Sequence, residues 1–195
     1  MGKFKPLMKY TDKTFLHHII IKLDTICSQI IIVTGFNSEK LQSETIKTLK
    51  DQKKESVLKK IKFAENPNFE KGMFTSLQRG LKEVRDLNLS SRLVNWILYH
   101  FVDQPGLPAE FYSSFIDQLD NAHNWIQPSY NSRHGHPILI SSDLFNFLLE
   151  ADESSNLKEL SKNQVVKKSI WNCSYKNVLQ DIDTEEDYIA NIDIE

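Results

Sequence analysis

An aspartate stands at the end of a largely apolar run in the middle of the chain. Asp103 closes a β-branched and aromatic stretch that begins at Trp96, and Gln104 and Pro105 follow it. Such a run predicts a buried strand, and open α/β sheets bind ligands at the carboxyl ends of their strands. Asp103 is therefore a candidate metal ligand or general base. The alternative is that it caps the helix or turn that follows.

Two further aspartates lie at the end of a second short segment, residues 178–182, which also predicts a strand. Asp181 and Asp183 would point to the same face of an extended segment. Proteins hold Mg²⁺ with one or two carboxylates together with phosphate oxygens and water. Asp103 and one member of this pair could hold one such ion. Asp183 could instead cap the last predicted helix, a role that Thr184 could also fill.

A glycine-containing loop with two hydroxyls precedes a predicted helix. Asn66-Pro67-Asn68 breaks a strand, and Gly72 comes just before the segment Met73-Phe74-Thr75-Ser76. The free N–H groups and the dipole of a helix start favour an anion or the polar edge of a base.

Three histidines need separate explanations. His134 and His136 flank Gly135, and alternate residues can share a metal, but no further ligand at zinc-site spacing accompanies them. A turn in which one histidine faces a substrate is the favoured interpretation. His100 lies inside an apolar run, which predicts a hydrogen-bonded core residue.

The elements that would position these residues alternate between helix and strand. The predicted helices span residues 14–25, 38–49, 73–87, 108–120, 143–150, 156–162 and 185 onward. The predicted strands span residues 29–34, 61–65, 96–103, 125–130, 137–141, 165–171 and 178–182. Short connections between alternating elements imply parallel strands with helical crossovers, hence a three-layer α/β/α architecture. One domain over residues 1–195 is expected. A strand ahead of Thr14 is also expected, and none is present in the sequence.

The amino-acid composition disfavours nucleic acid and membranes as binding partners. Lys plus Arg number 24 and Asp plus Glu number 26, which gives a formal charge of −2 and no strong field for nucleic acid or anionic lipid. Cys27 and Cys173 lie far apart and are typical of buried thiols in a reducing cytoplasm. No apolar run is long enough to span a bilayer, and no signal peptide is visible. These features predict a cytoplasmic protein that binds neither nucleic acid nor membrane.

Six short segments together carry a family resemblance. They are Met1-Gly2-Lys3-Phe4-Lys5-Pro6-Leu7, Ile32-Val33-Thr34-Gly35, residues 66–77, Asp103-Gln104-Pro105, Gly135-His136-Pro137 and residues 181–187. In this order they resemble the MobA-like nucleotidyltransferases, particularly the molybdenum-cofactor cytidylyltransferase branch. The resemblance implies a Rossmann-like nucleotidyltransferase fold with a mostly parallel mixed sheet.

The resemblance also implies a reaction. A nucleoside monophosphate would pass from an NTP, CTP or GTP, to a phosphate-bearing acceptor such as molybdopterin cofactor, with Mg²⁺ bound and pyrophosphate released. A molybdoenzyme or its chaperone would be a further partner. The implied catalytic residues are Lys5, on the triphosphate, and Asp103. The implied nucleotide-binding residues are Gly2, Lys5, Asn66, Gly72 and Ser76. The implied metal ligands are Asp103 with Asp181 or Asp183, and His136 would face the acceptor.

Two departures from the family pattern bear on activity. The family's first strand and its glycine-rich loop are absent, and Glu185 replaces a proline. The preferred explanation is a start codon assigned too late, because Met1 matches a methionine inside the first motif. The alternative is a truncated, non-catalytic nucleotide- or partner-binding protein of the same fold. A further alternative is a sugar- or alcohol-phosphate nucleotidyltransferase.

Overall fold

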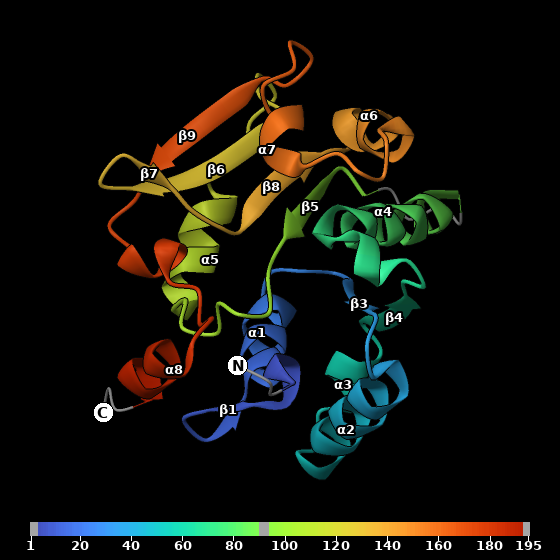
Figure 1. Ribbon diagram of the computed structural model, residues 1–195, viewed down its shortest axis with the longest axis vertical. Coiled ribbons are helices and arrows are strands. Elements are labelled where there is room, and N and C mark those ends of the chain that lie inside the picture. Colours follow the sequence, from blue (N-terminus) through green and yellow to red (C-terminus); the bar gives the residue numbers. More distant parts are fainter. Residues whose placement is uncertain (1–3, 90–93, 193–195) are drawn as a thin grey trace.

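The computed structural model describes residues 4–89 and 94–192, and Figure 1 shows their arrangement. The α-helices are α1 Phe15–Asp24, α2 Ser38–Asp51, α3 Glu55–Leu58, α4 Met73–Leu89, α5 Ala109–Ile116, α6 Phe145–Glu150, α7 Leu157–Leu160 and α8 Glu185–Ile192. The strands are β1 Lys9–Tyr10, β2 Lys13–Thr14, β3 Ile30–Thr34, β4 Ile61–Glu65, β5 Trp96–Tyr99, β6 Trp125–Tyr130, β7 Arg133–His134, β8 Ile138–Ser141 and β9 Lys168–Asn172. Short 3₁₀ turns occupy Lys5–Leu7, Phe69–Lys71, Ser142–Leu144 and Lys176–Leu179.

The strands form a mixed α/β arrangement, as expected. β3 and β4 pair in parallel, with Ile30 opposite Ile61. The larger sheet has the order β5-β8-β6-β7, and β9 lies parallel to the other edge of β6. β8 runs antiparallel to both β5 and β6. A small hairpin of β1 and β2 precedes α1.

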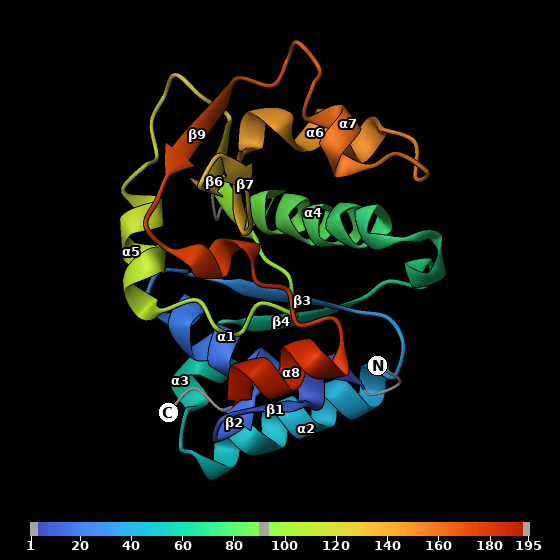
Figure 2. The same ribbon diagram turned by 60° about the vertical axis from the view of Figure 1, so that its left-hand side comes forward.

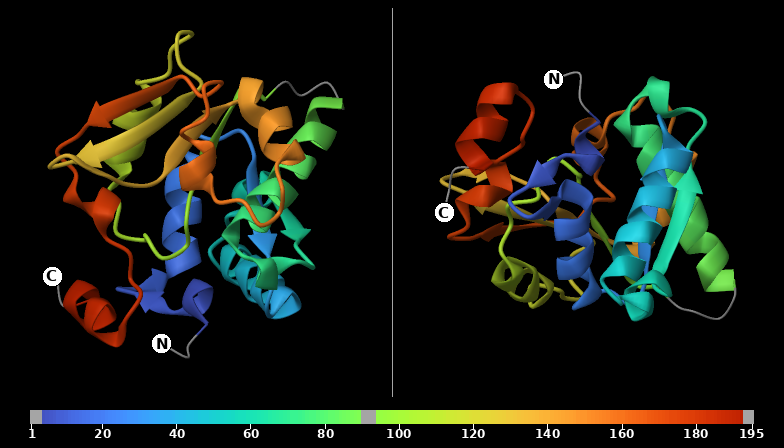
Figure 3. Two further views of the ribbon diagram at one scale, coloured as in Figure 1. Left: turned by 45° about the horizontal axis from the view of Figure 1, so that its top comes forward. Right: turned by 90° about the horizontal axis from the view of Figure 1, so that it is seen from below.

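Helices lie on both sides of the β3–β4 pair. Figure 2 shows α4 on one side of these strands and α1 and α2 on the other. Figure 3 shows α8 beside the β1–β2 hairpin, so the carboxyl-terminal helix lies near the start of the chain. The rings of Phe15 and Tyr188, one from α1 and one from α8, are 6.1 Å apart.

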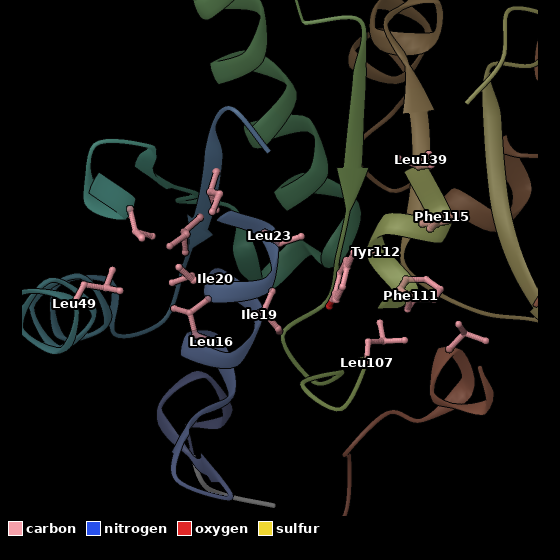
Figure 4. Packing of buried hydrophobic residues seen from close by; sticks show 14 of the residues in the cluster. Leu16, Ile19, Ile20, Leu23, Leu49, Leu107, Phe111, Tyr112, Phe115 and Leu139 are labelled. Carbon is pink, nitrogen blue, oxygen red and sulfur yellow. The ribbon is translucent and has the colours of Figure 1, made fainter. Parts of the chain in front are cut away.

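The first core is built around α1. Thr14 caps this helix, because its hydroxyl accepts the backbone N–H of His17 at 3.2 Å. Apolar residues at spacings of three and four then form one buried face. Figure 4 shows Leu16, Ile19, Ile20 and Leu23 of α1 next to Leu49 of α2 and the aromatic side chains of α5.

The second core joins α4 and α6 to the larger sheet. Phe74, Leu77 and Leu81 of α4 are buried against Trp125 and Ile140 of the sheet. No helix in the described ranges has the length and apolar composition that crossing a membrane requires. Both cysteines are free thiols and half-buried.

Most predicted elements are present, and four assignments are corrected. β5 ends at Tyr99, because β8 pairs with four residues only and His100 turns away to Tyr112. The segment 178–182 is not a strand: it begins in a 3₁₀ turn and pairs with no strand. β9 starts three residues later than the predicted strand, and α3 lies between the predicted helix 38–49 and the predicted strand 61–65, where no element is predicted.

The predicted role of His100 is confirmed. Its Nε2 atom lies 2.8 Å from the Tyr112 hydroxyl, and its Nδ1 atom lies 2.6 Å from the Phe101 carbonyl oxygen. Burial lowers the pKa of His100 to about 4, so the ring is neutral at physiological pH.

Candidate active site

Asp103 lies in the loop between β5 and α5, four residues beyond the strand. Its Oδ1 atom is buried and has no hydrogen-bond partner in the described structure. Burial first, and then the nearby Asp181 carboxylate, raise the pKa of Asp103 to about 6. A buried carboxylate oxygen without a partner is costly, so this atom is poised to accept a cation or a proton.

A backbone bond and a buried amide bring the segment around Asp181 to this loop. The Ile182 N–H donates to the Asp103 carbonyl oxygen at 3.0 Å. The Gln104 side-chain amide donates to Asp181 Oδ1 at 2.8 Å and to the Val178 carbonyl oxygen at 3.3 Å. Gln104 is almost completely buried, and it is a positioning residue that the sequence analysis did not single out.

Asp183 pairs with Lys5 and does not cap the last helix. The Thr184 hydroxyl accepts the Asp187 N–H at 3.0 Å, and Asp187 Oδ2 accepts the Thr184 N–H at 2.8 Å. This reciprocal capping leaves the Asp183 carboxylate free to meet Lys5 Nζ at 2.5 Å. Asp181 and Asp183 are both exposed and flank the buried Ile182, as expected for an extended segment.

His136 lies beside the segment that carries Asp181, because its backbone N–H donates to the Val178 carbonyl oxygen at 3.0 Å. Its ring centroid is 4.4 Å from that of Phe101, and its Nδ1 atom is buried without a partner in the described structure. At Gly135 an added Cβ would lie 2.3 Å from the same carbonyl oxygen, so this close approach requires glycine. Burial lowers the pKa of His136, which keeps its ring neutral.

The loop before α4 is organised by one buried amide. Asn66 Nδ2 donates to Thr75 Oγ1 at 2.9 Å and to Ser76 Oγ at 3.0 Å, while Asn66 Oδ1 accepts the Asn68 N–H at 3.0 Å. Gly72 has a φ of 116°, which favours glycine. Asn66 and Ser76 therefore shape the helix start. Gly2 lies outside the described residues.

A cavity of about 1020 Å³ opens beside these elements. His136, Gly72 and Phe101 contribute to its wall, together with Trp125 and several cationic side chains. The cationic lining residues outside the histidines are Lys71, Arg133, Lys158, Lys162 and Lys168. Sequence reasoning missed this group, because its members come from separate strands and loops.

The cations of the cavity differ in their partners. Lys71 pairs with Glu153 at 2.7 Å, and Lys162 pairs with Glu159 at 2.8 Å. Lys168 instead has no carboxylate partner among the ion pairs of the described residues: its Nζ atom donates to Ser161 Oγ at 2.9 Å and lies 5.4 Å from the Trp125 ring centroid. Burial lowers the pKa of Lys168. Lys168 is thus placed to meet an anion that enters the cavity.

Comparison with known proteins places the chain in a family. The model of the MobA-like NTP transferase domain matches residues 1–168. The chain belongs to this family.

Individual relatives agree with this assignment. The chain is 24% identical over 191 residues to the molybdenum cofactor cytidylyltransferase of Escherichia coli K12, covering 97% of this chain and 88% of that protein. A nucleotidyl transferase from Methanothermobacter has a TM-score of 0.72 at 18% identity, with 97% and 83% of the two chains covered. The manganese complex of Rv0371c from Mycobacterium tuberculosis has a TM-score of 0.66 at 17% identity, with 98% and 92% covered.

These likenesses confirm a nucleotidyltransferase by family and a Rossmann-like fold. Within residues 4–89 and 94–192, no three His, Cys, Asp or Glu side chains converge on one point as metal ligands. The partnerless Asp103 oxygen beside Asp181 does fit an ion that takes its remaining ligands from phosphate and water.

Proposed function

We propose that this MobA-like protein transfers CMP from CTP to a phosphate-bearing acceptor of the molybdopterin type and releases pyrophosphate. The single observation that carries the proposal is the buried, partnerless Asp103 oxygen, with Asp181 and the Lys5–Asp183 pair around it. The relationship to a cytidylyltransferase supports CTP over GTP. Asp103 and either Asp181 or Asp183 would hold Mg²⁺.

The residues of this chain suit in-line attack on an α-phosphate, a reaction that needs positioning and charge neutralisation more than a protein nucleophile. Lys5 would leave Asp183 and bind the triphosphate, where its charge stabilises the leaving pyrophosphate. Gly2, Asn66, Gly72 and Ser76 would form the nucleotide-binding side of the site. A bound Mg²⁺ would supply charge neutralisation at the phosphate oxygens.

The large cavity would take the acceptor. Its volume of about 1020 Å³ accommodates a ring system with a phosphate group. His136 and Trp125 offer aromatic surface to the ring. Lys168 and Arg133 offer positive charge to the phosphate, which then becomes the attacking nucleophile.

This reaction also suggests where the protein acts and which protein it would meet. We place the reaction in the cytoplasm, and a molybdoenzyme or its chaperone would accept the finished cofactor. A non-catalytic nucleotide- or partner-binding protein of the same fold is the second candidate function. It is favoured by the Lys5–Asp183 contact, which occupies the lysine that catalysis would need on the triphosphate.

The decisive experiment measures pyrophosphate release. The four NTPs are each combined with a molybdopterin-type acceptor or with sugar and alcohol phosphates, in Mg²⁺, in Mn²⁺ or in EDTA. We expect release with CTP and the molybdopterin-type acceptor, dependent on a divalent ion. Asp103→Asn should abolish it, whereas Asp51→Asn, at an exposed helix end, should not. NTP binding without release in any combination would establish the second candidate.

A further inference from the structure

The loop that carries Asp103 is fixed through its backbone carbonyl oxygens. The carbonyl oxygen of Asp103 accepts the Ile182 N–H at 3.0 Å. Two residues later, the carbonyl oxygen of Pro105 accepts a hydrogen bond from Lys22 Nζ at 2.7 Å. Lys22 belongs to the last turn of α1, and Figure 2 shows α1 beside the chain as it passes from β5 to α5. Two segments that are far apart in the sequence therefore both hold this loop.

Lys22 occupies a position where its charge is costly. Its side chain is half-buried, and none of the ion pairs of the described residues includes it. Burial lowers the pKa of Lys22 to about 8, from an ordinary value of about 10.4. The folded state therefore holds the ammonium group less readily than the unfolded state does, and at neutral pH this charge opposes folding. Stability alone does not account for a lysine at this position.

The contact acts on the position of Asp103 and not on its charge. The nearby carboxylates and Lys5 are the charged groups that shift the pKa of Asp103 in the described structure. Lys22 reaches Asp103 through the backbone, because the carbonyl oxygen that it binds belongs to buried Pro105. The proline ring fixes φ and restricts the residue before it, which is Gln104. Anchoring Pro105 therefore limits the movement of the whole segment 103–105.

We propose that Lys22 is a positioning residue, whose bond to the Pro105 carbonyl oxygen fixes the loop so that Asp103 Oδ1 is held ready for a divalent ion. This inference rests on the proposed function, in which Asp103 holds the metal. A carboxylate whose backbone is already fixed loses less conformational freedom when it binds an ion, so it binds the ion more tightly.

The test compares three variants of the full chain. Lys22→Met removes the donor and keeps the length of the side chain, and Lys22→Arg restores a cationic donor. Lys60→Met is the matched control, because Lys60 Nζ also donates to a backbone carbonyl oxygen, that of Asp24 at 2.8 Å, outside the Asp103 loop. Hydrogen exchange is followed by NMR at the Ile182 amide, which donates to this loop, with the amides of β6 and β9 as reference. Binding of Mn²⁺ alone is titrated by electron paramagnetic resonance.

The two readouts separate positioning from a general loss of stability. We expect Lys22→Met to speed exchange at the Ile182 amide about tenfold or more, with β6 and β9 unchanged, and to weaken Mn²⁺ binding about tenfold. Lys22→Arg should bring both values back to within about threefold of those of the original chain, and Lys60→Met should change neither.

Unchanged exchange at Ile182 in Lys22→Met would overturn the proposal. Equal acceleration at Ile182, β6 and β9 would also overturn it, because the lysine would then support the fold as a whole. If Lys22→Met does not fold, Lys22→Arg decides: original exchange and Mn²⁺ binding support the proposal, and a loss of Mn²⁺ binding with unchanged exchange at Ile182 contradicts it. If the original chain neither binds Mn²⁺ nor releases pyrophosphate, the proposed function fails, whereas exchange at Ile182 still decides whether Lys22 fixes the loop.

Discussion

Lys5 Nζ contacts Asp183 Oδ1 at 2.5 Å, so residues 178 positions apart meet beside Asp103. The Asp183 side chain is 62% exposed, and surface ion pairs of this kind contribute no more than about 1 kcal/mol to folding. The Lys5–Asp183 ion pair therefore adds little to the free energy of unfolding. Its position suits a lysine that exchanges a protein carboxylate for a substrate phosphate.

Replacing Lys5 should separate activity from stability. We expect Lys5→Met to change the free energy of unfolding by less than about 1 kcal/mol, and to lower kcat for pyrophosphate release by about 100-fold or more. Urea unfolding and steady-state kinetics measure the two effects. Lys9→Met, at an exposed strand position, is the matched control. A fall in kcat equal to that of the control would remove Lys5 from the mechanism.

Asp103→Asn should make the protein more stable at high pH and inactive. The pKa of Asp103 is raised to about 6, so the folded state binds the proton more tightly than the unfolded state does. The contribution of Asp103 to folding stability is thus greatest below about pH 4 and is lost as pH rises through about 6, by up to about 3 kcal/mol. Because asparagine does not titrate, the Asp103→Asn variant does not lose this stability at high pH. Urea unfolding at pH 4 and pH 8 should show a gain for the variant at pH 8 only, and a gain independent of pH would contradict the explanation.

Asn66→Ala should weaken both folding and nucleotide binding. The substitution leaves the Asn68 N–H without its partner and removes two bonds to the hydroxyls of Thr75 and Ser76. Because these groups are largely buried, we expect a loss of about 2 kcal/mol and a higher KM for CTP. Ser43→Ala, which removes an exposed side-chain bond on α2, provides the control. An unchanged KM would limit Asn66 to a structural role.

Two lysines of the large cavity should behave differently. Lys168 has no carboxylate partner among the described ion pairs, whereas Lys162 is paired with Glu159. We expect Lys168→Ala to raise KM for the phosphate-bearing acceptor about tenfold without changing KM for CTP. Lys162→Ala should change either value by less than threefold. Equal effects of both variants would place the acceptor phosphate elsewhere.

Local sequence patterns determined most elements of this protein. The 3.6-residue apolar period of α1, its Thr14 cap and the β-branched run of β3 act over a few residues, so they are visible without tertiary contacts. The segment at 178–182 was predicted wrongly to be a strand, because a local apolar pattern does not show which contacts bury the residues. Val178 is apolar because it is buried in the core around α1 and α5, and its carbonyl oxygen accepts from Gln104 and His136 instead of from a neighbouring strand.

The sequence by itself also indicated the family, through short motifs in a fixed order, and the family model confirms it. Only the tertiary structure decided how the polar groups pair. It placed Asp183 on Lys5 because Thr184 took the helix cap, left Asp103 Oδ1 buried without a partner, and gathered Lys168 and Trp125 in one cavity. These relationships join residues far apart in the chain. They depend on packing, which no local pattern records.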